Sequence, residues 1–168
     1  MTLPPQTPAQ AAQALYAILP HAMTQAALEE YGIDAAPEQA QQITRELLSV
    51  NLYWVQSALQ MVLTKTASER VLLALREHLR SVWETDLGLN GQDVQGYFEE
   101  AEERRHTYDL IVQEGGAPVA VFTECAGILE SAWALRAEDR SKALALFIDL
   151  VPVDEIGEVL EGSDLGKT

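Results

Sequence analysis

The chain has 168 residues, 48% of them hydrophobic and 22% charged, and a chain of this size can bury a core without a disulfide or a structural metal. Eleven Lys and Arg against twenty-six Asp and Glu leave a net charge of −15, which repels phosphate groups and so excludes direct binding of nucleic acid or of an anionic membrane surface. Because Cys125 is the only cysteine, and because we find no secretory signal and no apolar run of about 18 residues, we expect a cytoplasmic protein without an intramolecular disulfide.

Apolar residues recur at helical spacing through most of the chain, and no run of alternating β-branched residues indicates a sheet. The pattern predicts helices over 8–31, 37–65, 68–86, 93–114, 118–135, 138–151 and 154–160. Pro20 has to kink or split the first of them. We therefore expect an all-α single domain over 1–168, a bundle of about six to seven helices around the long central helix over 37–65, with flexible ends at 1–8 and 162–168.

Side chains that can cap a helix mark three of these starts. Thr66 and Glu69 match a capping box, in which the hydroxyl and the carboxylate each bond a free backbone amide of the first turn. Asp93 and Asp154 are the expected N-caps of the helices that follow them. These residues predict where the chain turns from one helix into the next.

The helix over 37–65 has a polar edge opposite its wide apolar arc, and this edge carries little charge. Such an edge is typical of a contact surface, although a solvated helix face explains it equally well. The first 66 residues are also the least charged part of the chain, at a net −3. We expect this part to be buried or to take part in self-association. The predicted interface residues are Arg45, Ser49, Tyr53, Gln56 and Gln60.

Glu103 and His106 stand three residues apart in the helix predicted over 93–114, and a Glu-x-x-His pair is how di-iron bundles present half of their ligands. No second pair of this kind is present. At about 100° per residue, Glu99, Glu103 and His106 fall opposite the apolar stripe of their helix, so a solvated face is the main interpretation. A metal site formed by these three residues with Glu124 is the alternative.

Arg104 and Arg105 lie on the shoulders of the same apolar stripe, where a guanidinium needs a carboxylate or an aromatic ring beside it. The main interpretation is that they pair with Glu102 or Asp109 along their own helix. The alternative is a small anionic ligand held between helices. Its predicted ligand-binding residues are Arg104, Arg105, Tyr97 and Tyr108.

The sequence contains no catalytic constellation and none of the common nucleotide-binding or hydrolase motifs. We therefore expect a protein–protein interaction or regulatory module that acts as a homodimer and needs no cofactor. One alternative is a metal- or cofactor-binding enzyme, since the chain resembles ferritin-like and heme-oxygenase-like proteins in its helix content and its single Glu-x-x-His pair. A second alternative is an acidic phosphate mimic that occupies a nucleic-acid-binding partner.

Overall fold

The computed structural model describes residues 4–116 and 118–167, and over these residues the chain forms eight α-helices, one 3₁₀ turn and no strand. The prediction of an all-α protein is confirmed. The helices are α1 (Pro8–Ile18), α2 (Gln25–Glu30), α3 (Pro37–Val62), α4 (Lys65–Val82), α5 (Val94–Gln113), α6 (Pro118–Ser131), α7 (Arg140–Leu150) and α8 (Val153–Glu161), with the 3₁₀ turn over Ala137–Asp139. None of the helices in these residues combines the length and the apolar composition that a membrane span requires.

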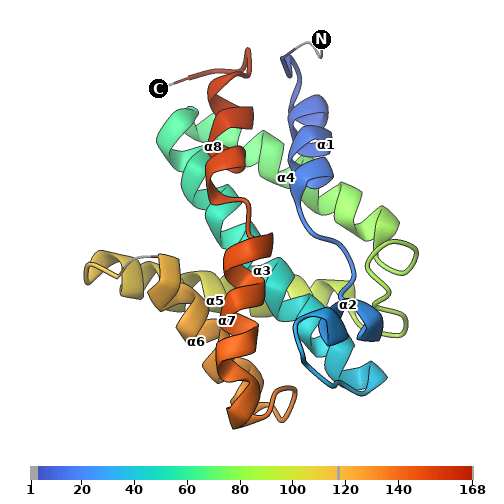
Figure 1. The fold of residues 1–168 in the computed structure, drawn as a ribbon. Helices are drawn as coiled ribbons and strands as arrows, with labels where there is room; N and C mark the ends of the chain where they lie inside the picture. Colours follow the sequence, from blue (N-terminus) through green and yellow to red (C-terminus); the bar gives the residue numbers. More distant parts are fainter. Residues whose placement is uncertain (1–3, 117, 168) are drawn as a thin grey trace.

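Helix α3 runs through the middle of the molecule and is its longest helix (Figure 1). Its 26 residues extend over about 39 Å. Around its C-terminal half lie α1, α4 and α8, and around its N-terminal half lie α2, α6 and α7, while α5 crosses it. Each end of α3 has its own buried apolar cluster, and Trp54 packs against both. One long helix thus joins two small cores into a single domain.

The first predicted helix, 8–31, is split into α1 and α2, so the fold has one more helix than the sequence predicted. Leu19 ends α1 in an extended conformation, and Thr24 begins α2 by accepting a hydrogen bond from the Ala27 amide at 3.1 Å. Pro20 lies in the break. A proline has no amide proton and its ring clashes with the preceding turn, which explains why the helix does not continue.

The capping box predicted at Thr66 and Glu69 is wrong. Helix α3 ends at Val62, three residues earlier than expected, and Thr64 becomes the N-cap of α4 by accepting a hydrogen bond from the Ala67 amide at 3.3 Å. Thr66 therefore lies inside the first turn of α4. Two threonines two residues apart offer the same capping chemistry, and the position at which the chain turns decides between them.

The other two predicted caps have different outcomes. Asp93 caps α5 as expected, because its carboxylate accepts a hydrogen bond from the Gln95 amide at 3.1 Å. Asp154 does not cap α8, which begins one residue earlier, at Val153, after Pro152. In the first turn, however, the Asp154 carboxylate still lies where the positive end of the helix dipole favours a negative charge.

The C-terminal residues predicted to be flexible make several contacts. The Asp164 amide donates to the Pro5 carbonyl at 2.8 Å, and the Thr64 amide donates to the Gly166 carbonyl at 2.7 Å. The side chain of Ser163 is buried. The flexibility of the two ends stays a prediction, and residues 1–3 and 168 lie outside the described part of the chain.

Helix α6 ends at Ser131, four residues before its predicted end, because Trp133 has a left-handed backbone with φ of +63°. The Ala134 amide donates to the Leu129 carbonyl at 2.9 Å, which is the hydrogen bond of a Schellman helix end. Glycine is the usual residue at this position. The Trp133 side chain is 86% exposed, so packing within the chain does not offset the backbone strain.

We therefore expect Trp133→Gly to raise the free energy of unfolding by about 0.5–1 kcal/mol. Relief of the left-handed strain, about 1–2 kcal/mol, exceeds the added entropy of glycine in the unfolded chain, about 0.5–1 kcal/mol. Urea unfolding followed by circular dichroism measures the change. Trp133→Ala is the control, because alanine keeps the strain and loses little packing. A glycine variant less stable than the alanine variant would contradict the strain.

Candidate functional site

A buried ion-pair network holds α5 on α3. The carboxylate of Glu46, on α3, is fully buried and accepts two hydrogen bonds from Arg104 on α5, from Nε at 3.1 Å and from Nη2 at 3.0 Å. Glu100 accepts a further bond from Arg104 at 3.3 Å and is also ion-paired with Arg45. Burial raises the pKa of Glu46 and Arg104 opposes this rise, while the bonds to Glu46 raise the pKa of the Arg104 guanidinium. The network fixes how α5 lies against α3.

This network changes the interpretation of the predicted anion site. The carboxylate held by Arg104 belongs to Glu46 of the same chain. Tyr97 is buried with its hydroxyl 3.2 Å from the Ser49 hydroxyl, and the fully buried Tyr108 hydroxyl has no hydrogen-bond partner among the described residues. Burial raises the pKa of both tyrosines, so both stay protonated. These side chains stabilise the contact between α3 and α5.

Arg105 behaves as the main interpretation of the sequence predicted. Its guanidinium donates to Glu102 at 2.6 Å and to Asp109 at 2.9 Å, which lie about one helical turn before and after it along α5. The hydrogen bonds from Arg105 lower the pKa of Glu102. Arg105 also lines an open hollow of about 600 Å³.

The predicted metal ligands lie on the solvent side of their helices. Glu99, Glu103 and His106 line a shallow, open hollow of about 400 Å³ on the outer face of α5. Glu124 is exposed on α6. Throughout 4–116 and 118–167, no three His, Cys, Asp or Glu side chains are grouped so as to hold a metal ion. The apolar stripe of α5 turns toward α3, and this leaves the Glu-x-x-His pair in solvent.

The predicted interface residues on α3 separate into two groups. Ser49 and Tyr53 are buried, and the Arg45 side chain is committed to Glu100. Gln56 and Gln60 reach the surface. The polar, weakly charged edge of α3 is therefore a contact surface along its first part, but its partner there is α5 of the same chain. Only the last part of this edge is open to another molecule.

Three neighbouring hollows meet at Gln56 and form one continuous feature, which we call the trough. It follows the C-terminal half of α3 and is walled by α4 and α5. Its two larger parts have volumes of about 430 Å³ and 600 Å³. Residues shared by two or more of the hollows are Gln56, Gln60, Leu72, Arg76, Phe98 and Glu102.

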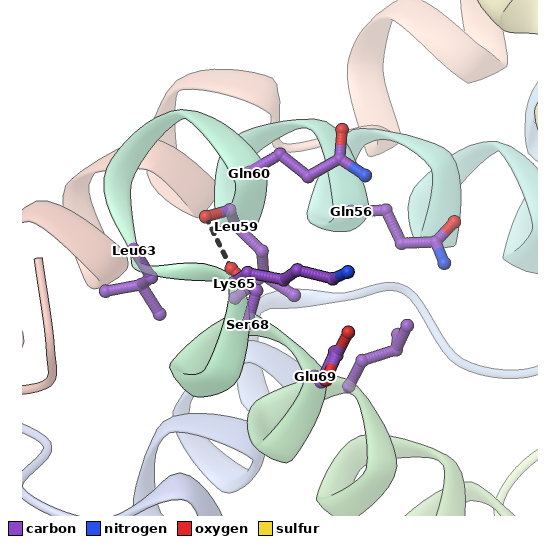
Figure 2. Close-up of a pocket in the computed structure, with 8 residues that line it drawn as sticks. Gln56, Leu59, Gln60, Leu63, Lys65, Ser68 and Glu69 are labelled. Atoms are coloured by element: carbon purple, nitrogen blue, oxygen red, sulfur yellow. Dashed lines mark hydrogen bonds between the residues drawn. The ribbon is translucent and has the colours of Figure 1, made fainter. Parts of the chain in front are cut away.

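At the corner between α3 and α4, the floor of the trough is apolar and its rim is polar. Leu59 and Leu63 form the floor and are nearly fully buried. Figure 2 shows the Gln56 and Gln60 amides standing side by side on α3, with the Lys65 side chain extended alongside them from the start of α4. Among the described residues, neither glutamine side chain makes a hydrogen bond. The rim thus presents free donors and acceptors above an apolar surface.

The trough also has charged walls. Arg76 on α4 places its guanidinium 5.6 Å from the centre of the Phe98 ring, and Glu99 lies on α5. Within the described part of the chain, neither Arg76 nor Glu99 forms an ion pair. This combination of apolar floor, free amides and unpaired charges makes the trough the candidate site. Comparison of the chain with protein-family models, with curated proteins and with solved structures finds no significant match.

Proposed function

We propose that this protein is an interaction or regulatory module that binds protein through the trough, and that it acts as a homodimer. The observation that carries the proposal is the pair of free amides, Gln56 and Gln60, above the floor of Leu59 and Leu63. A glutamine amide both donates and accepts, which suits it to the backbone of a bound chain, and an apolar centre with a polar rim is the usual composition of a protein interface.

The shape of the trough favours a macromolecule over a small ligand. A small-molecule site encloses most of its ligand, whereas these hollows open to solvent and continue from one into the next. The polar groups that could have specified an enclosed ligand, Arg104 and Tyr97, are engaged with Glu46 and Ser49.

The charge of the trough favours a second copy as the partner. At a net −15, two copies repel each other over most of their surfaces. The residues that line the trough are balanced, since three are basic and three are acidic. A neutral, apolar-floored surface is the place where such a repulsion is weakest. The six residues are Lys65, Arg76, Arg105, Glu69, Glu99 and Glu102.

Light scattering coupled to size exclusion tests the proposal, and we expect a mass of twice 18.5 kDa at micromolar concentration. Gln56→Trp places a large ring where the three hollows meet and should weaken the dimer about tenfold or more. Gln113→Trp, at the exposed end of α5, is the matched control and should leave the dimer intact. The mass of a single chain for the wild type would overturn the homodimer, and equal effects of the two substitutions would overturn the trough as its site.

A further inference from the structure

We infer that two copies meet trough to trough about a two-fold axis, with Arg76 of each copy paired to Glu99 of the other. This inference rests on the proposed function, because the Arg76–Glu99 pair is the contact that would specify the homodimer. In the hollow between α4 and α5, Arg76 and Glu99 are the charges that form no ion pair among the described residues.

The two other arginines near Arg76 and Glu99 have partners within the chain. Arg105 is held by two carboxylates of α5, and Arg80 donates to Gln95 at 3.0 Å and lies 3.8 Å from Glu77. Arg76 is half-buried beside the face of Phe98, and its charge helps to lower the pKa of Glu102, but among the described residues it forms no ion pair. A half-buried guanidinium interacts more strongly with a carboxylate than one in open water does, because the surrounding dielectric is lower. Arg76 is therefore the cation with most to gain from an external carboxylate.

Glu99 supplies that carboxylate in a second copy. It lines the same hollow of about 600 Å³ as Arg76 but comes from α5, whereas Arg76 comes from α4. In a two-fold contact, if residue i of one copy touches residue j of the other, then j also touches i. One unpaired cation and one unpaired anion in the same hollow meet this condition, and the symmetric contact forms two ion pairs.

Charge reversal tests the pairing by measuring dimer dissociation constants with light scattering or sedimentation. Arg76→Glu and Glu99→Arg should each weaken the homodimer about tenfold or more, because each places two like-charged pairs across the axis. An equimolar mixture of these two variants should form a heterodimer of near wild-type affinity, since both contacts in it join opposite charges. The double variant should form a homodimer for the same reason.

The controls carry the same changes in charge elsewhere on the same helices. Arg70→Glu is on the exposed side of α4 and Glu103→Arg is on the outer face of α5, and we expect neither to weaken the dimer comparably. Far-ultraviolet circular dichroism and urea unfolding verify that each variant is folded.

The outcomes separate the inference from the proposed function. A wild-type chain that stays monomeric would overturn both. A wild-type dimer that Arg76→Glu leaves unchanged would overturn the pairing while leaving the homodimer standing. A dimer that both single variants weaken, but that their mixture does not restore, would also overturn the pairing. Restoration in the mixture and in the double variant supports it.

Discussion

Replacing Arg104 by Met is expected to lower the free energy of unfolding by about 3–5 kcal/mol. The substitution keeps most of the side-chain volume but removes the two hydrogen bonds to Glu46, whose carboxylate is then buried without a counter-charge. Leaving a buried charge unpaired costs far more than losing an exposed pair. Urea unfolding followed by circular dichroism measures the loss.

The neighbouring arginine provides the matched control. Arg105 forms as many ion pairs as Arg104, but its partners Glu102 and Asp109 are 51% and 38% exposed. Arg105→Met should cost only about 0–1 kcal/mol. Replacing both Glu46 and Arg104 by Leu should recover much of the loss, because no unpaired charge is then buried. Equal losses for the two single arginine variants would contradict the buried network.

Periodicity made the helices predictable from the sequence. A helix that buries one face repeats its apolar residues at a fixed spacing, and this signal is local, so the length and central role of α3 could be derived without a structure. The same periodicity does not determine the residues at which a helix begins and ends. The sequence predicted Thr66 as the cap of α4, where the structure has Thr64, and it predicted an α6 that continues to residue 135, where the helix ends at Ser131. Both differences show that the position of a helix end depends on where the chain turns.

The candidate site could be predicted only in part, because it depends on contacts between residues far apart in the chain. Glu46 is 58 residues from Arg104, and nothing near Arg104 in the sequence indicates that its carboxylate is on α3. The pattern that could have pointed to it is the polar edge of α3, which Glu46 shares with Arg45 and Ser49. A buried carboxylate in such an edge requires a cation from a facing helix.

The two halves of the polar edge of α3 have different surroundings. The first half packs on α5, which supplies the polar side chains it needs, and the second half lies along the trough between α4 and α5. Composition alone cannot separate these halves, because Ser49 and Gln60 are both uncharged. The path of α5 decides which residues are left for a partner.

The second large effect is expected on α4, where Leu75→Ala should cost about 2–5 kcal/mol through loss of buried surface and the cavity left behind. Leu75 is 0% exposed in the cluster that α4 forms with α1 and α3, whereas Leu73, two residues earlier, is 61% exposed. Leu73→Ala should change the free energy of unfolding by less than about 0.5 kcal/mol. Urea unfolding of both variants measures the difference, and equal losses would show that α4 is rotated from its described orientation.

A third leucine on α4 connects stability with binding. Leu72 is half-buried and lines two of the hollows that form the trough. Leu72→Ala should cost less stability than Leu75→Ala, since part of its surface already faces water. In the proposed dimer that same surface is covered by the partner, so Leu72→Ala should weaken self-association while Leu73→Ala should not. The stability and self-association of the three Leu→Ala variants together test whether α4 turns one face to the core, one to the trough and one to solvent.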